Sequence, residues 1–180
     1  MHERPYDIIV WGASGFTGRI VVDYTHQEYG NGNLRWAVAG RNPAKLESVV
    51  GGRDIPVLNA DSHDDDALRQ LVQQTKVILT TVGPYARYGS KLVAACAEHG
   101  TDYCDLTGES LWMREMISAH QQTAKDSGAR IVHTCGFDSI PSDIGVFFLQ
   151  KEMQRRHGVA ARHIKYLSLI HISEPTRHRR

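Results

Sequence analysis

Three regularly spaced glycines near the amino terminus form the part of this sequence best suited to bind a phosphate. They follow the apolar run 8–11 in a segment that reads Gly12-Ala13-Ser14-Gly15-Phe16-Thr17-Gly18. In such a turn the first glycine permits a tight bend, the second lets the backbone approach a pyrophosphate, and the third lets a helix pack on a sheet. The helix start offers N–H groups to the anion, and Ser14 and Thr17 add hydroxyl donors. The spacing predicts a dinucleotide site, with a purely structural turn as the alternative.

The residues after the second predicted strand indicate which dinucleotide would bind. NAD-binding proteins usually place Asp or Glu there to hold the ribose hydroxyls, but this segment reads Ala39-Gly40-Arg41-Asn42. No carboxylate repels a 2′-phosphate, and Arg41 can hold it through charge-assisted hydrogen bonds worth roughly 1.5–3 kcal/mol. We therefore expect NADP(H), with Arg41 and Asn42 in the site and Lys45 one helical turn further on. The alternative for Arg41 is a solvated surface side chain.

Two further strand ends supply candidate cofactor contacts. Asp61 follows the third predicted strand and suits either the adenine amino group or a helix cap. Val82, Gly83 and Pro84 end the fourth predicted strand, at the edge where open parallel sheets bind ligands. We expect their backbone to face the pyrophosphate and the nicotinamide ribose, although a plain strand-ending turn would look the same in sequence.

Alternating strand and helix patterns must position these residues. Apolar runs predict strands at 7–11, 34–39, 55–58, 77–82, 102–105 and 130–134. Between them, helical patterns cover 16–28, 65–74, 90–99 and 110–127, with further helices starting at Asn42-Pro43 and near Ser142. Glycines at 100 and 128 are helix stops. Six alternations predict an α/β fold with a doubly wound parallel sheet of the Rossmann type.

Composition argues against several other classes of protein. The 180 residues are 41% hydrophobic and 23% charged, with a formal net charge of +1, so bulk charge gives no reason to expect a nucleic acid partner. No apolar run approaches the roughly 20 residues of a membrane-spanning helix, and the amino terminus lacks a signal-peptide core. A cytosolic or peripheral protein is the expectation. The three cysteines read as reduced thiols, and neither they nor the scattered histidines indicate a metal site.

The last stretch of the chain looks foreign to the rest. Residues 167–177 read Leu-Ser-Leu-Ile-His-Ile-Ser-Glu-Pro-Thr-Arg and resemble the in-frame translation of a transposase-type sequencing adapter. Three arginines and one glutamate in 167–180 account for the positive net charge of the whole chain. We therefore interpret 167–180 as a non-native tail and exclude it from arguments about the fold; a genuine basic tail is the alternative.

Five blocks in order carry a family resemblance. They are residues 12–18, 39–42, 82–85, Asp102-Tyr103-Cys104-Asp105-Leu106-Thr107-Gly108-Glu109 and Cys135-Gly136-Phe137-Asp138-Ser139-Ile140-Pro141-Ser142-Asp143. Together they resemble saccharopine-dehydrogenase-like oxidoreductases of the trans-acting enoyl reductase type, over roughly residues 5–155. The resemblance implies hydride transfer from NADPH to a double bond of an acyl or polyketide-type substrate. It also implies an NADP-binding domain at 1–150, a connection at 151–166 and a substrate domain that is essentially absent, so that this chain alone is not expected to be active.

The residue that would supply a proton after hydride transfer stays open. Asp138 and Tyr85 are candidates, but Asp138 also suits a helix cap near Pro141, and Glu109 suits a cap of the helix that follows it. A short-chain dehydrogenase is excluded because no lysine has a tyrosine four residues before it. Two alternatives to the enoyl reductase remain: a reductase of saccharopine metabolism and a non-enzymatic NADP-binding regulatory module.

Overall fold

Six parallel strands form one sheet in the order β3-β2-β1-β4-β5-β6. In the computed structural model, which describes residues 4–167, these strands are β1 (Tyr6–Trp11), β2 (Trp36–Gly40), β3 (Val57–Asn59), β4 (Thr75–Thr80), β5 (Asp102–Cys104) and β6 (Ile131–Val132). The order runs outward from β1 in one direction and from β4 in the other. This arrangement confirms the predicted doubly wound sheet and leaves a crevice at the carboxyl ends of β1 and β4.

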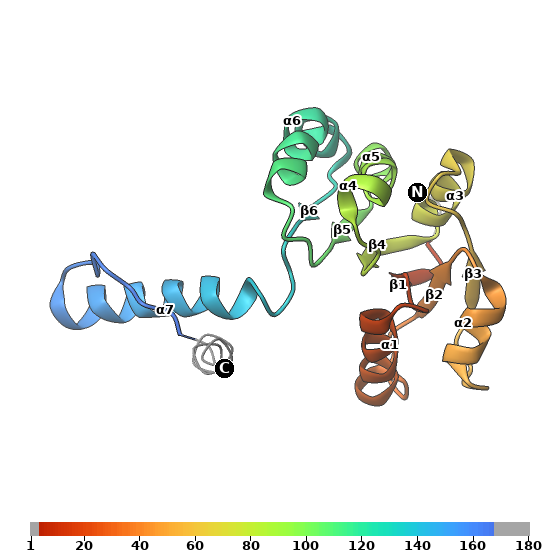
Figure 1. Ribbon diagram of the computed structural model, residues 1–180, viewed down its shortest axis with the longest axis horizontal. Coiled ribbons are helices and arrows are strands. Elements are labelled where there is room, and N and C mark those ends of the chain that lie inside the picture. Colours follow the sequence, from red (N-terminus) through yellow and green to blue (C-terminus); the bar gives the residue numbers. More distant parts are fainter. Residues whose placement is uncertain (1–3, 168–180) are drawn as a thin grey trace, which may run out of the picture. The chain divides into compact units, whose positions relative to one another are not determined.

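Helices cover both faces of the sheet (Figure 1). The segments are α1 (Phe16–Tyr29), α2 (Pro43–Val50), α3 (Asp65–Gln73), the short α4 (Tyr85–Tyr88), α5 (Ser90–His99) and α6 (Ser110–Ser127). Successive strand residues point to opposite faces, so side chains on the two faces of β1 pack into two separate hydrophobic cores. Ile9 packs with α3, α5 and α6 residues, whereas Val10 packs with α1 and α2 residues.

Local sequence signals account for most helix boundaries. Asn42 caps α2 by accepting a hydrogen bond from the Lys45 N–H, and Pro43 follows as the first helical residue, as predicted. Gly100 and Gly128 end α5 and α6 with φ of +64° and +82°, a conformation that favours glycine. These two helices therefore match their predicted ranges at both ends.

The differences from prediction that bear on the carboxyl edge of the sheet lie after β4 and β6, while β2 and β3 also begin two residues later than predicted. β4 ends at Thr80 rather than at residue 82, so Val82 and Gly83 belong to the loop that follows. That loop contains a cis Gly83–Pro84 peptide bond and leads into α4, a four-residue helix that has too few residues for a periodic pattern. β6 has only two residues, because the chain turns at Thr134, which has φ of +61°.

The chain divides into two compact units, residues 1–136 and residues 137–180. The first holds the sheet and helices α1–α6. The second holds α7 (Ile140–His157), whose residues are all at least partly exposed. No helix within 4–167 is long and apolar enough to cross a bilayer. Residues 168–180 of the predicted foreign tail lie outside the described residues, and the predicted domain boundaries stay a prediction.

Candidate functional site

A cavity of about 420 Å³ lies at the carboxyl ends of β1, β2 and β4, where the strand order reverses. Open α/β sheets bind ligands at this switch point. Seven of the residues predicted from the sequence line it: Gly12, Ser14, Gly15, Arg41, Val82, Gly83 and Pro84. The cavity thus joins three loops that are far apart in the sequence.

The glycine turn forms the middle of the cavity wall. Gly12 has φ of +86°, and Gly15 N–H donates to Gly12 O at 2.9 Å, which closes a tight bend. A Cβ at Gly18 would collide with Gly12 O and lie 2.8 Å from Ala13 Cα. Gly18 is therefore the close contact between helix and turn that the spacing predicts.

The start of α1 is open to an anion. Gly15 occupies the N-cap position with no side-chain hydrogen bond, and the first turn of the helix contains no acidic residue. The first N–H groups of a helix lack intrahelical partners and carry a partial positive charge. An uncapped start beside a glycine turn is the arrangement that binds a pyrophosphate in dinucleotide-binding folds.

Arg41 lies at one end of the cavity, directly after β2. Its side chain is exposed and makes no hydrogen bond or ion pair with any residue of the described range 4–167. Asp61 lies within electrostatic reach of Arg41, since the Arg41 charge adds to the hydrogen bonds from His63 that hold the pKa of Asp61 down. A guanidinium without a partner at this position is available for a phosphate.

The other predicted site residues lie around the cavity but do not line it. Ala13 and Gly18 are buried behind the turn, while Thr17 and Phe16 are exposed on α1, Phe16 at 86%. The side-chain oxygen of Asn42 is engaged in capping α2.

Asp61 occupies a turn rather than a helix cap. Its Oδ1 accepts hydrogen bonds from the backbone N–H and from Nδ1 of His63 at 2.9 and 3.0 Å, and these bonds lower its pKa. The cap of α3 is Asp64 instead. Ser62, next to Asp61, lines the cavity.

Five lining residues were missed by the sequence analysis: Trp11, Gly40, Ser62, Thr81 and Tyr88. The position of Thr81 directly after a buried strand was a usable signal, since strand ends meet at this edge. Its Oγ1 lies 3.4 Å from Gly12 O, which ties the loop after β4 to the glycine turn. Tyr88 had no such signal because it belongs to the unpredicted α4.

The loops that follow β5 and β6 are joined by a buried carboxylate. Asp105 accepts hydrogen bonds from Tyr103 Oη at 2.9 Å, from His133 Nδ1 at 2.6 Å, and from the N–H groups of Thr107 and Thr134 at 3.1 and 3.0 Å. Burial alone would raise the pKa of Asp105, but the bonds from His133, Thr107 and Thr134 outweigh it and hold that pKa below its usual range. An ionised carboxylate only accepts, so His133 donates from Nδ1.

The candidate proton donors differ in their surroundings. Tyr85 is buried, its hydroxyl donates to Thr80 O at 3.3 Å, and burial raises its pKa to about 12. That phenol therefore faces protein and not the cavity. Asp138 belongs to the second unit, where Ser139 and not Asp138 takes the N-cap position of α7.

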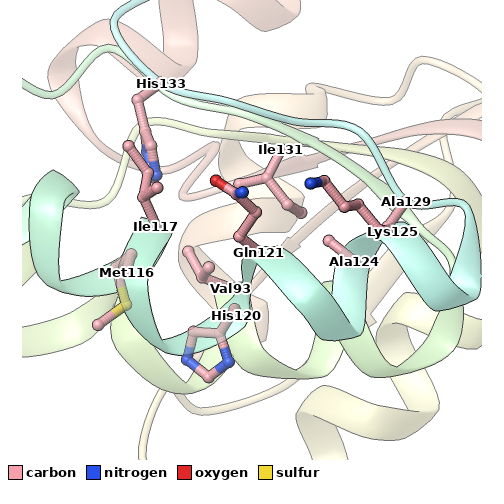
Figure 2. Close-up of a pocket in the computed structure, with 10 residues that line it drawn as sticks. All are labelled: Val93, Met116, Ile117, His120, Gln121, Ala124, Lys125, Ala129, Ile131 and His133. Carbon is pink, nitrogen blue, oxygen red and sulfur yellow. The ribbon is translucent and has the colours of Figure 1, made fainter.

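A smaller cavity, of about 200 Å³, lies against α5, α6 and β6 (Figure 2). It is lined mainly by apolar side chains such as Val93, Met116 and Ile131, with His120 and Lys125 among its polar residues. It contains no glycine turn and none of the predicted site residues. The cavity at the glycine turn is therefore the candidate functional site.

A parallel sheet in this order, with a glycine turn at its switch point, defines a dinucleotide-binding α/β domain. The chain belongs to the saccharopine dehydrogenase NADP binding domain family, whose profile matches residues 8–132. The cofactor of the domain is accordingly NADP(H), as predicted. This match also confirms the resemblance that the five sequence blocks indicated.

Curated relatives extend the comparison. The chain is 44% identical over 154 residues to a trans-acting enoyl reductase of Mycobacterium tuberculosis, and 46% identical over 154 residues to one of Mycobacterium ulcerans. Each match covers 83% of this chain but 36% of the relative. The chain thus spans about a third of the length of these relatives.

Solved structures show the same fold at low identity. Saccharopine dehydrogenase from Saccharomyces cerevisiae matches with a TM-score of 0.70 at 20% identity, over 83% of this chain and 32% of that one. A triphenylmethane reductase from Citrobacter, solved with NADP(H), matches with a TM-score of 0.54 at 14% identity, over 82% of this chain and 55% of that one.

Proposed function

We propose that this chain is the cofactor domain of a reductase that passes a hydride from NADPH to the carbon–carbon double bond of an enoyl substrate. The observation that carries the proposal is the cavity that runs from the unpartnered Arg41 to the uncapped start of α1. The names of the relatives, trans-acting enoyl reductases, supply the reaction. The substrate itself would bind mainly to parts of such a reductase that this chain does not contain.

Each part of the cavity has a proposed contact with one part of the cofactor. Backbone of the turn 12–18 would hold the pyrophosphate, and Arg41 would hold the 2′-phosphate, with Asn42 beside it. Asp61 would lie near the adenine. Val82, Gly83 and Pro84 would contact the nicotinamide half, because they follow β4, which lies on the other side of β1 from the strand that Arg41 follows. When bound, NADPH supplies the hydride, and these residues orient it.

We propose an acyl or polyketide-type chain as the enoyl-bearing substrate, on the strength of the identity to the enoyl reductases. A longer protein that contains this domain, assayed with NADPH and an enoyl thioester, should oxidise NADPH. Oxidation with an aldehyde and glutamate instead would favour a saccharopine-type reaction. If neither substrate is reduced although NADPH binds, a regulatory NADP-binding module is the better description.

The cofactor assignment is tested by Arg41→Ala and calorimetry with NADPH and NADH. Loss of a charge-assisted hydrogen bond should weaken NADPH binding by about tenfold to a hundredfold. NADH lacks the 2′-phosphate, so its affinity should change by less than about twofold. Arg114→Ala, an exposed arginine on α6, is the matched control. Equal weakening of both nucleotides by Arg41→Ala would contradict the role of Arg41.

A further inference from the structure

Glu109 caps a helix other than its own. It occupies the N-cap position of α6 yet makes no side-chain hydrogen bond to that helix. Its carboxylate turns to α4 instead, where Oε1 accepts from Tyr85 N–H at 2.7 Å and Oε2 accepts from Ala86 N–H at 2.9 Å. A carboxylate from the loop after β5 therefore takes the first two N–H groups of the helix that follows β4.

This contact fixes one wall of the cavity at the glycine turn. Gly83 and Pro84, which line that wall, directly precede the residue that Glu109 holds. Tyr85 is anchored a second time at its hydroxyl, which accepts from Leu106 N–H at 3.4 Å. The wall is thus attached to the loop after β5 through both the backbone and the side chain of one tyrosine.

Glu109 is in turn held by the buried Asp105. The Glu109 N–H donates to Thr107 Oγ1 at 3.1 Å, and the Thr107 N–H donates to Asp105 Oδ1 at 3.1 Å. His133 and Thr134 reach the same carboxylate from the loop after β6. A continuous set of hydrogen bonds therefore runs from the ends of β5 and β6 to the cavity wall.

We propose that Glu109 is the positioning residue for the nicotinamide half of the cofactor, because its carboxylate sets the position of the wall formed by Gly83 and Pro84. The inference rests on the proposed function, since it assumes that NADPH occupies this cavity with its 2′-phosphate at Arg41. The residues that hold the other half of the cofactor, the turn 12–15 and Arg41, make no hydrogen bond to Glu109. The two halves should therefore respond differently when Glu109 is changed.

The experiment compares two ligands on this chain by calorimetry: NADPH, and adenosine 2′,5′-bisphosphate, which lacks the nicotinamide half. Glu109→Ala removes both acceptors and should weaken NADPH binding by about tenfold. Glu109→Gln keeps one acceptor oxygen without the charge and should weaken it by about threefold. Binding of the bisphosphate should stay within about twofold of the unsubstituted chain in both variants. Glu115→Gln, an exposed glutamate on α6, is the control.

The outcomes separate this inference from the proposed function. If the unsubstituted chain binds neither ligand, the proposed function fails. If the unsubstituted chain binds both ligands, two results would show that the positioning role is wrong. In one, both Glu109 variants weaken the binding of NADPH and of the bisphosphate equally; in the other, they weaken the binding of neither ligand. Retained bisphosphate binding shows that a variant is folded. Should Glu109→Ala fail to fold, the ratio of the two affinities in Glu109→Gln decides.

Discussion

The turn after β1 and the loops after β5 and β6 lie at the same edge of the sheet but are built in opposite ways. The turn depends on missing side chains: Gly15 and Gly18 bring backbone against backbone, and Gly12 lets the turn approach Val82. The two loops depend on a buried charge, with Asp105 accepting four hydrogen bonds.

The two regions differ in which polar groups they leave available to bind a ligand. The turn leaves backbone N–H groups without side-chain partners at the start of α1. In the loops the carboxylates of Asp105 and Glu109 already accept hydrogen bonds from the chain itself. One region is therefore suited to bind a ligand, and the other to hold the cavity wall formed by Gly83 and Pro84.

Gly18→Val should break the turn and give the largest effect. The added side chain would meet Gly12 O and the Ala13 backbone, neither of which can move without reshaping the turn. We expect the free energy of unfolding to fall by about 3 kcal/mol, with loss of measurable NADPH binding. Urea denaturation and calorimetry measure the two effects. Gly145→Ala, in α7 with no atom within 4 Å of the added Cβ, is the control. Unchanged NADPH affinity in Gly18→Val would show that the turn does not bind the cofactor.

Asp105→Asn should weaken the loops with a smaller effect on the turn. The amide keeps one acceptor oxygen but loses the charge that accepts from His133, Thr107 and Thr134. We expect a loss of about 2 kcal/mol in the free energy of unfolding, measured in urea at pH 7. Asp54→Asn, an exposed aspartate, is the control and should change stability by less than about 0.5 kcal/mol. A loss no larger than that of the control would mean that the charge of Asp105 contributes nothing to the loops.

The pH dependence of stability should sharpen the same contrast with the smallest effect. Burial by itself would raise the pKa of Asp105. The hydrogen bonds from His133, Thr107 and Thr134 have the larger combined effect and hold this pKa below the usual value of about 3.9. Between the lowered pKa of folded Asp105 and its usual value, the unfolded chain binds more protons than the folded chain. The contribution of Asp105 to the free energy of unfolding is therefore fully present above the usual pKa and is lost as the pH falls through the lowered pKa. Urea denaturation from pH 6 down to pH 3 should therefore show a shallower decline in Asp105→Asn than in the unsubstituted chain. Equal slopes would exclude Asp105 as a source of the acid sensitivity.

Local signals in the sequence predicted much of the fold and the turn, because the groups involved are close in sequence. The spacing of Gly12, Gly15 and Gly18 identifies a turn, and glycine stops give α5 and α6 their ends. The role of Glu109 could not be found this way. Its partners Tyr85 and Ala86 lie 24 and 23 residues earlier, so no local spacing relates them. A carboxylate at a helix start predicts a cap of that same helix, and the tertiary contact overrides it.

The capping of the helix starts also makes the two ends of the cavity electrostatically different. Of the four helices that follow β1 to β4, Asn42 accepts from one N–H of α2, Asp64 from two of α3 and Glu109 from two of α4, whereas no side chain does so at α1. The Glu109 carboxylate, which lies next to the wall formed by Gly83 and Pro84, repels anions, while the dipole at α1 and the Arg41 guanidinium attract them. A long ligand that is negative at one end and in its middle, and uncharged at the other end, would therefore align itself in a single orientation before close contacts form.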